Sequence, residues 1–499
     1  MKVLVANRGE IAVRIIRACR ELGYPTVAVY SEPDRAALHV VYADQAIPIG
    51  PAPSRESYLR IDRIIDAAKT TGADAVHPGY GFLAENAEFA RACRDAGLLF
   101  IGPSPESIDA MGSKTEARQR MKAAGVPVVP GLTEAVKSFD EIAAFAAQAG
   151  LPIMIKAAAG GGGKGMRLVT REDELRQAYE RTTSEAASFF GNPAVYAEKF
   201  VESPRHIEVQ IVGDQHGNLV HLGERECTLQ RRHQKVVEEC PSPVVDEELR
   251  QRLGAMAVKA AAAVSYYSAG TIECLMGPDR QFYFLEMNTR LQVEHPVTEM
   301  VWGVDLVKAQ LLIAQGGKLP WRQEQLKPSG HAIECRIYAE DPARKFAPSP
   351  GLIRYMNLPQ GPGVRNENGV YPGYTVPVFY DPMLSKLVCH SSTRADAIER
   401  MKRALMEYRI QGIETTIPFF TFLMNHPDFR AARFDTGFID GLLPQLALGP
   451  NRLDRERVDA AIAAAAILAF EDAERVQLPA DQDSQWKRAG REEAVRGGL

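Results

Sequence analysis

The first hundred residues alternate short apolar runs with amphipathic segments, and this pattern constrains the fold more than any other feature of the chain. Val3–Val5 and Thr26–Tyr30 are typical of strands, and Ile11–Leu22 between them carries an apolar stripe at helical spacing. Ala73–Val76 and Leu98–Ile101 are further strand candidates, with helices between them. Strand–helix alternation at this pitch predicts a parallel sheet with helices on its faces.

The predicted sheet places one loop where ligands usually bind. In such sheets ligands lie at the carboxyl ends of the strands, and His77–Phe82 directly follows one strand candidate. His77 and Tyr80 in this segment also suit a tight turn around a buried aromatic ring, so the pattern alone leaves both interpretations open.

The pattern changes after residue 130. Ile153–Lys156 and Met166–Val169 are typical of strands, and the glycine-rich segment Gly160–Gly165 between them predicts a flexible flap. From about residue 203 apolar and polar residues alternate, which is typical of antiparallel strands. In Ile207–Ile211 one face is apolar, and the polar face, which includes Glu208, must look at solvent or at a site.

Composition excludes several classes of protein. A chain of 499 residues is long enough for several domains, and its net charge of −4 gives no basic signature, so nucleic acid is not an expected partner. Its seven cysteines are scattered without a Cys-x-x-Cys pair, which argues against a disulfide framework or a zinc site. The N-terminal apolar run is too short for a signal peptide, and no run approaches the roughly 18–20 residues of a membrane span. We therefore expect a cytoplasmic protein with no membrane partner.

A hairpin with two carboxylates is a candidate metal site. The pattern predicts a four-residue loop, with Met276 paired with Gln281 and Glu273 opposite Phe284. Alternation then places three oxygen-bearing side chains on one face, with the carboxylates as diagonal neighbours: Glu273, Glu286 and Asn288. A solvated polar face is the alternative, but the flanking positions are apolar, and buried carboxylates need a partner. Oxygen ligands favour Mg²⁺ or Mn²⁺ over zinc.

The stretch Glu286–Pro296 concentrates carboxylate, amide, guanidinium and imidazole groups within eleven residues. It follows the apolar run Phe282–Leu285, so a strand end delivers oxygen ligands beside the fixed positive charge of Arg290. This combination suits an anionic substrate held against a metal-bound polyphosphate.

Three further motifs suit anion binding, but each also has an ordinary structural interpretation. Backbone N–H groups of Gly160–Gly165 can approach phosphate, which Lys156 favours, although a flexible surface loop explains the same pattern. It is not a Walker A motif, because no Ser or Thr follows its lysine. Gln230–Lys235 offers donors for phosphate and ribose, or is a basic surface loop. Arg336 shares a strand face with Glu334, and a structural salt bridge between them is the simpler interpretation.

The chain carries five motifs in order: Ala6–Ala12, His77–Phe82, Gly160–Gly165, Arg231–Lys235 and Glu286–Pro296. Together they resemble biotin carboxylase, the ATP-grasp subunit of biotin-dependent carboxylases, over about residues 1–446. The resemblance implies a mixed α/β and α+β multidomain fold. Its parts are a Rossmann-like N-terminal domain (1–113), an ATP-grasp lid with the glycine-rich loop (114–203), the large ATP-grasp half with the metal and bicarbonate sites (204–330) and an antiparallel C-terminal domain (331–446).

The resemblance also implies roles for the residues at matching positions. For ATP these are Lys114, Lys156, Gly162, Gly163, Glu198, Lys199, Phe200, Val201, His206, Gln230, His233, Glu273 and Glu286. For Mg²⁺ or Mn²⁺ they are Glu273, Glu286 and Asn288. For bicarbonate they are Lys235, Arg290, Gln292, Val293, Glu294 and Arg336, and for biotin Tyr80 and Arg336.

The implied reaction is the ATP-dependent carboxylation of biotin through carboxyphosphate, the first half-reaction of acetyl-CoA carboxylase in fatty acid biosynthesis or of a related acyl-CoA or pyruvate carboxylase. Glu294 is expected to act as general base on bicarbonate. Arg290 and Lys235 would hold bicarbonate and the γ-phosphate in line, and Arg336 would stabilise the biotin oxyanion. Carboxyphosphate is labile, so a closing glycine-rich lid is useful.

The expected partners follow from what the chain lacks. It has no Met-Lys-Met motif, so biotin is expected on a separate biotin carboxyl carrier protein, with a carboxyltransferase as a further subunit. Arg17 and Glu21 match residues at which bacterial family members meet a partner subunit, although Pro362 stands where an aromatic residue often packs. We therefore expect a homodimer. The partner carboxyltransferase, not this chain, would select acetyl-CoA, propionyl-CoA or pyruvate.

The segment 447–499 has its own character. Val458, Ile462, Ala466 and Phe470 keep helical spacing, and the chain turns polar after Pro479, so we expect a helical and polar extension. It resembles the extension of some acyl-CoA or pyruvate carboxylase subunits.

Two other functions remain as alternatives. Another ATP-grasp ligase, joining a carboxylate to an amine, would share the metal and glycine-loop features but would not explain Arg290 with Gln292–Glu294, or the Tyr80 turn. A catalytically silent nucleotide-binding subunit would require the loss of a ligand residue, and none is missing.

Overall fold

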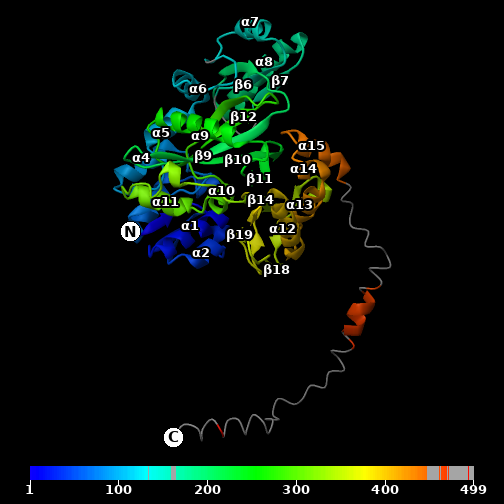
Figure 1. The fold of residues 1–499 in the computed structure, drawn as a ribbon. Helices are drawn as coiled ribbons and strands as arrows, with labels where there is room; N and C mark the ends of the chain where they lie inside the picture. The colour runs from blue at the N-terminus through cyan, green and yellow to red at the C-terminus, as the bar shows by residue number, and fades with distance from the viewer. Residues whose placement is uncertain are drawn as a thin grey trace. The chain divides into compact units, whose positions relative to one another are not determined.

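The computed structural model describes residues 1–132, 134–158 and 165–446, and beyond them residues 460, 462–468, 470 and 493. The chain divides into two units, Met1–Leu446 and Ala447–Leu499. The sheets that position the site belong to the first unit (Figure 1). In the second unit residues 460, 462–468 and 470 are helical with exposed side chains, as the spacing of Ile462, Ala466 and Phe470 predicts, whereas Val458 lies outside the described residues.

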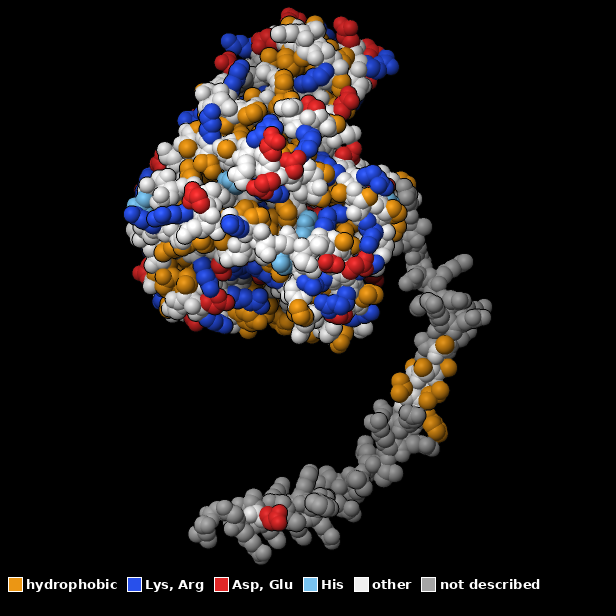
Figure 2. All heavy atoms as spheres, viewed as in Figure 1, with side chains coloured by type: hydrophobic (Ala, Val, Ile, Leu, Met, Phe, Trp, Pro, Cys, Tyr) orange, Lys and Arg blue, Asp and Glu red, His pale blue; other side chains and the backbone are white. Residues whose placement is uncertain are grey.

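The face of the first unit seen in Figure 2 mixes basic, acidic and apolar side chains, and neither sign of charge dominates it. Within the described ranges, no helix combines the length and the apolar character that crossing a membrane requires.

The N-terminal part forms the predicted parallel sheet. Its strands are β1 (Val3–Val5), β2 (Thr26–Ser31), β3 (Gln45–Gly50), β4 (Ala75–His77) and β5 (Leu99–Phe100), in the order β3-β2-β1-β4-β5. Side chains of β1 alternate between the two faces of the sheet. Val3 and Val5 pack with α1 (Gly9–Glu21) on one face, whereas Leu4 packs with α3 (Ile61–Thr71) and α4 (Ala87–Asp95) on the other. The sequence pattern missed β3, which is an edge strand interrupted by Pro48.

A small antiparallel sheet follows, at the top of Figure 1. It has the order β7-β6-β8, from β6 (Ile153–Ala157), β7 (Met166–Val169) and β8 (Val195–Lys199). The predicted pairing of the two strands that flank the glycines is confirmed, with Lys156 opposite Met166. Helices α7 (Phe139–Ala149) and α8 (Leu175–Phe190) pack on this sheet through a separate apolar core.

The largest sheet has eight antiparallel strands in the order β13-β12-β9-β10-β11-β14-β21-β19. The strands are β9 (Arg205–Gly213), β10 (Leu219–Arg231), β11 (Gln234–Cys240), β12 (Ser268–Met276), β13 (Phe282–Asn288), β14 (His331–Tyr338), β19 (Val364–Asn368) and β21 (Met383–Ser391). Because β11 pairs with β14, the sheet continues across residue 330, the predicted boundary between the large ATP-grasp half and the C-terminal domain.

Helices cover the eight-stranded sheet and so decide which of its faces can hold a site. The apolar face of β9 packs on α9 (Glu247–Ala262), and α12 (Arg394–Glu407) and α13 (Ile417–Asn425) cover the C-terminal strands. Helices α10 (His295–Trp302) and α11 (Leu306–Ala314) share a core with α1. The remaining helices of the first unit are α2 (Leu38–Tyr42), α5 (Pro105–Gly112), α6 (Lys114–Ala123), α14 (Pro427–Arg430) and α15 (Phe438–Leu442).

The predicted register of the β12–β13 hairpin is wrong by one residue. Met276 pairs with Phe282 rather than Gln281, and Cys274 rather than Glu273 lies opposite Phe284. A bulge between Glu273 and Cys274 then shifts the register again, so Glu273 and Glu286 are direct partners rather than diagonal neighbours. The backbone positions of Glu273 and Glu286 are therefore closer together than in the predicted pairing.

A buried carboxylate joins the N-terminal sheet to the C-terminal strands. Asp34 is fully buried and accepts two hydrogen bonds from Arg8, at 2.6 and 2.7 Å. The hydroxyl groups of Tyr58 and Tyr374 also donate to it, at 2.6 and 3.3 Å. Burial alone would raise the pKa of Asp34, but the Arg8 guanidinium outweighs burial and lowers it.

We expect Asp34→Asn to lower the free energy of unfolding by about 3 kcal/mol, because it leaves the Arg8 cation largely buried without a charged partner. Thermal denaturation of the two proteins side by side measures the loss.

Asp62→Asn is the matched control, since Asp62 pairs with Arg60 on the surface and should melt like the parent chain. Equal melting temperatures for the Asp34 variant and the control would contradict the anchoring role of Asp34.

Candidate active site

Most of the predicted site residues line one cavity of about 550 Å³. It lies where β6 and β8 of the small sheet face β9, β11, β12 and β13 of the large one. The predicted residues in its wall are Lys156, Glu198, Lys199, Phe200, Val201, His206, Gln230, His233, Lys235, Glu273, Glu286, Asn288, Arg290, Gln292, Val293, Glu294 and Arg336. Gly162, Gly163 and the side chain of Lys114 lie outside the described residues.

Lys235 lines this cavity, and its ammonium contacts three carboxylates. It donates to Glu208 at 2.5 Å, to Glu294 at 2.7 Å and to Glu273 at 2.9 Å. The three carboxylates come from β9, from β12 and from the turn that leads into α10. Burial disfavours the charged amine, but the carboxylates outweigh burial and hold the pKa of Lys235 well above its usual value.

Sequence reasoning placed Glu208 on the polar face of its strand but assigned it no role. Its second oxygen accepts from Arg225, whose side chain is fully buried. Glu208 therefore lies between two cations, and it contributes a third carboxylate to the group around Lys235. Only the alternation in β9 pointed to it.

Glu294 lies between two cations. One oxygen accepts from Lys235, and the other accepts from Arg336 Nη2 at 2.9 Å. Burial raises the pKa of Glu294, but Lys235, Arg336 and Arg225 outweigh it and lower the pKa well below the usual value. Glu294 is therefore ionised at neutral pH.

Arg336 does not pair with Glu334, so the structural salt bridge suggested by their shared strand face is wrong. Its Nε donates to Glu238 at 2.6 Å across the β11–β14 pairing, and its Nη2 reaches Glu294. Among the described residues the carboxyl oxygens of Glu334 have no hydrogen-bond partner. Burial raises the pKa of Glu334 well above its usual value.

Arg290 is held by a residue that sequence reasoning missed. Its Nε donates to Glu85 at 2.8 Å, and Glu85 also accepts from the backbone of Thr289 at 3.1 Å. Its Nη2 donates to Asn288 at 2.9 Å. Glu85 follows the predicted His77–Phe82 turn by three residues, but only tertiary contact brings it to this strand end.

The carboxylate pair fits a hard cation. Glu273 and Glu286 face each other on paired strands, and Asn288 donates to Glu273 at 2.8 Å. His206 Nε2 lies 3.1 Å from the second oxygen of Glu273. Two carboxylates and an amide oxygen on one wall of the cavity are ligands that Mg²⁺ accepts.

The other end of the cavity carries a second buried ion-pair group. Glu198 on β8 accepts from Lys156 on β6, and from Arg118 Nη1 at 3.0 Å. Arg118 lies on α6, and no sequence motif marked it. These contacts place two cations beside the strand from which the glycine-rich segment departs.

A second cavity of about 510 Å³ adjoins the first. The two share the side chains of Gln234, Arg290, Val293 and Arg336, and the second also contains Tyr80. Asn7 donates to the carbonyls of Pro78 and Tyr80, both at 2.7 Å, and so fixes the turn that carries this ring.

The hydroxyl of Tyr80 is buried and has no hydrogen-bond partner among the described residues. Tyr80 thus belongs to a tight turn and also lines the second cavity. The tight turn is confirmed, and the role of Tyr80 in ligand binding stays a prediction.

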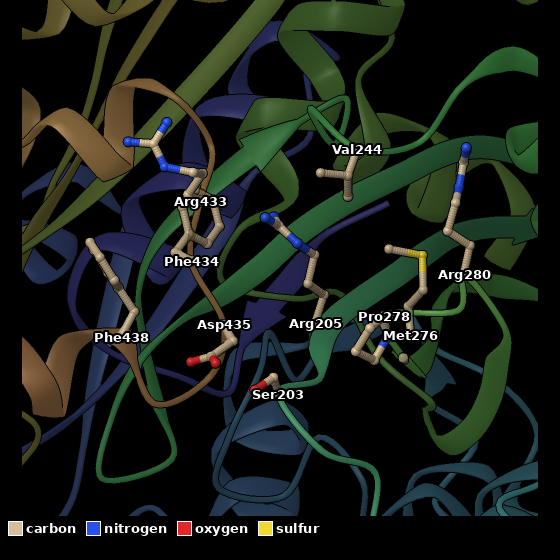
Figure 3. A pocket seen from close by; sticks show the side chains of 11 residues that line it. Ser203, Arg205, Val244, Met276, Pro278, Arg280, Arg433, Phe434, Asp435 and Phe438 are labelled. Carbon is tan, nitrogen blue, oxygen red and sulfur yellow. The ribbon is translucent and has the colours of Figure 1, made fainter.

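A third pocket, of about 650 Å³, holds none of the predicted residues. Figure 3 shows Arg205 pointing into it between Phe434 and Val244, with Ser203 and Asp435 at one end. The Arg205 guanidinium stacks over Phe434 at 4.5 Å and pairs with Glu226 at 3.1 Å. Its cation is already satisfied, so this pocket offers no reactive constellation.

Family models match nearly the whole first unit. Residues 1–108 match the N-terminal domain of biotin carboxylase, and residues 334–441 match its C-terminal domain. Residues 113–322 match the ATP binding domain of the carbamoyl-phosphate synthase L chain.

Named relatives agree with these matches. A biotin carboxylase of Halalkalibacterium halodurans is 56% identical over 438 residues, which cover 88% of this chain and 97% of the relative. A pyruvate carboxylase subunit of Methanothermobacter thermautotrophicus is 55% identical over 440 residues, covering 88% of this chain and 89% of the relative.

Solved structures match over the same region. The complex of Campylobacter jejuni biotin carboxylase with β,γ-ATP has a TM-score of 0.86 at 48% identity, covering 88% of this chain and 98% of the other. The biotin carboxylase domain dimer of Hydrogenobacter thermophilus 2-oxoglutarate carboxylase, solved with MgADP, ADP and bicarbonate, has a TM-score of 0.85 at 47% identity, covering 88% and 97%.

The Lys235 cluster predicts a pH-dependent stability. The pKa values of Glu273 and Glu294 are lowered, so these carboxylates stabilise the fold above their unfolded pKa of about 4.3, and this stabilisation is lost as the pH falls. Lys235→Met removes the cation, and mutual repulsion then raises both pKa values. We expect its melting temperature to lie far below the parent's near pH 8 and closer to it near pH 5, because protonation relieves the repulsion.

Lys69→Met makes the same change on the exposed face of α3 and serves as control. A melting deficit of Lys235→Met that stays constant between the two pH values would contradict the electrostatic account.

Proposed function

The chain belongs to the biotin carboxylase family: it is an ATP-grasp ligase that carboxylates biotin with bicarbonate at the expense of ATP, and we propose that the residues of the two adjoining cavities divide this reaction between them. The observation that carries the proposal is the shared wall. Gln234, Arg290, Val293 and Arg336 line both cavities, so a group activated in one can reach an acceptor in the other.

The first cavity takes MgATP. Lys156 with the glycine-rich segment and Lys114 contact the phosphates, Glu198–Val201 contacts the adenine, and His206, Gln230 and His233 contact the rest of the nucleotide. Glu273, Glu286 and Asn288 hold Mg²⁺, which when bound neutralises charge on the phosphoryl group. The lining of one cavity by Lys156, Glu198–Val201, His206, Gln230, His233, Glu273, Glu286 and Asn288 supports the assignment.

Bicarbonate binds beside the phosphates, at Lys235, Arg290, Gln292, Val293, Glu294 and Arg336. Lys235 supports this assignment, because its ammonium contacts both Glu273 of the metal pair and Glu294. One cation thus lies between the two reactants and can hold bicarbonate in line with the γ-phosphate. Attack by a bicarbonate oxygen forms carboxyphosphate and releases ADP.

Glu294 acts as the general base, and its surroundings explain how binding activates it. In the free cavity Lys235 and Arg336 keep its pKa well below the usual value, where a carboxylate is a weak base. A bound anion interacts with the same two cations and partly neutralises their charge, which raises the pKa of Glu294. The base therefore becomes competent only when bicarbonate is present.

The second cavity takes biotin, on Tyr80 and Arg336. The position of Tyr80 in this cavity, with Arg336 in the shared wall, supports the assignment. Carboxyphosphate decomposes to CO₂ and phosphate, phosphate deprotonates the ureido nitrogen, and Arg336 stabilises the oxyanion that forms.

Biotin reaches the site on a separate carrier protein, and a carboxyltransferase subunit completes the holoenzyme. We propose a cytoplasmic homodimer, which the dimeric domain of 2-oxoglutarate carboxylase supports. Within this chain Glu21 pairs with Lys308 at 2.6 Å, and the side chains of Arg17 and Glu21 remain partly exposed for such an interface. The proposed division is 1–113, 114–203, 204–330 and 331–446, with 447–499 as an extension. The spans of the three family models support the boundaries near residues 113 and 330.

Phosphate release from MgATP with bicarbonate, measured with and without free biotin, tests the proposed function. We expect turnover that biotin stimulates. Absence of biotin stimulation would contradict the proposal, turnover that depends on an amine would favour the carboxylate–amine ligase, and no turnover at all the silent subunit.

Glu294→Gln keeps the shape of the side chain and removes the base. We expect kcat to fall about a hundredfold or more, with ATP affinity largely preserved. Glu239→Gln is the matched control: Glu239 is an equally buried glutamate of β11 that binds Arg394 and His331 and lines neither cavity. Full turnover of the Glu294 variant would show that another group takes the proton.

A further inference from the structure

A fully buried lysine lies behind the wall that the two cavities share. The side chain of Lys386 on β21 is 0% exposed, and Lys386 lines neither cavity. Taking an ammonium out of water is costly unless its charge and its three N–H groups are compensated. Its partners therefore show what this position holds in place.

The first partner is the backbone of the shared wall. Lys386 Nζ donates to the carbonyl oxygen of Val293 at 2.8 Å. Val293 lines both cavities and stands between Gln292 and Glu294, which both contact Lys235. A shift of the Val293 carbonyl would move the bicarbonate residues on either side of it.

The other partners come from the N-terminal part of the chain. Glu10, in the first turn of α1, lies 3.2 Å from Lys386 Nζ, and the ring centroid of Tyr80 lies 5.6 Å from it. Glu10 and Tyr80 both line the second cavity. The Lys386 cation thus faces a carboxylate and an aromatic ring on the biotin side, and a carbonyl on the bicarbonate side.

Lys386 is also fixed by its own sheet. Its register partners are Arg336 on β14 and Glu367 on β19. Arg336 lies in the shared wall, so the strand that carries Lys386 runs directly beside the residue assigned to the biotin oxyanion.

We propose that Lys386 is a positioning residue that sets Val293 and Tyr80 at a fixed separation and thereby couples carboxyphosphate formation to biotin carboxylation. It acts through these two residues and touches no substrate. The inference rests on the proposed function, because it takes the first cavity as the bicarbonate site and the second as the biotin site.

Lys386→Met removes the charge and the donors while keeping the length of the side chain. With MgATP, bicarbonate and free biotin, we expect the KM for biotin to rise about tenfold and the carboxybiotin formed per phosphate released to fall by a similar factor. The KM for ATP should stay within about twofold of the parent value, because Lys386 lies outside the nucleotide wall.

Arg394→Met is the matched control. Arg394 pairs with the buried Glu239 at 2.7 Å, and its loss also breaks a buried ion pair, but it lines neither cavity. We expect a lower melting temperature with an unchanged ratio of carboxybiotin to phosphate. A merely structural role for Lys386 would give the same result as this control.

Glu10→Gln tests the positioning role of Lys386 if Lys386→Met does not fold. It leaves Lys386 in place but weakens its contact with residue 10 on the biotin side. The ratio of carboxybiotin formed to phosphate released should therefore also fall, by a smaller factor. An unchanged ratio in every variant that folds would overturn the inference. A parent enzyme without biotin-dependent turnover would instead overturn the proposed function itself.

Discussion

The ammonium of Lys235 is the contact on which the rest of the site depends. Three buried carboxylates, Glu208, Glu273 and Glu294, converge on it from β9, β12 and the turn before α10. Without a cation between them, like charges at this spacing would repel in a region from which water is largely excluded. The same ammonium therefore holds Glu273, a proposed metal ligand, beside Glu294, the proposed base.

The arrangement of the sheets turns this cluster into a two-substrate site. The eight-stranded sheet carries Lys235, Glu273 and Arg336 on strands that lie far apart in the sequence, and the small sheet adds Lys156 to the lining of the same cavity. The parallel sheet contributes Tyr80 from the loop after β4, where its topology predicts a ligand. Under the proposed function, the large sheet supplies the reactive centre, the small sheet a phosphate contact and the parallel sheet part of the biotin site.

Local sequence patterns predicted many helices and strands, but they did not predict contacts between residues far apart in the sequence. Alternation in β9 and the glycine-rich turn between β6 and β7 identified both antiparallel sheets before any tertiary information. The bulge opposite Glu273 escaped prediction, because nothing in the local pattern distinguishes Leu285 from a regular strand residue. The shared strand face favoured a pair of Arg336 with Glu334, but Arg336 donates instead to Glu238 of β11 and to Glu294 in the turn before α10. Glu85 and Arg118 carry no motif, and only the folded chain brings them to Arg290 and Glu198.

The central claim is that bicarbonate and the terminal phosphate of ATP react directly, side by side, around Lys235. Bicarbonate labelled with ¹⁸O tests this most directly. In a short reaction with MgATP and biotin, the account predicts that mass spectrometry finds one ¹⁸O atom from bicarbonate in each phosphate released. Unlabelled phosphate would mean that water attacks ATP in this cavity, and it would contradict the account.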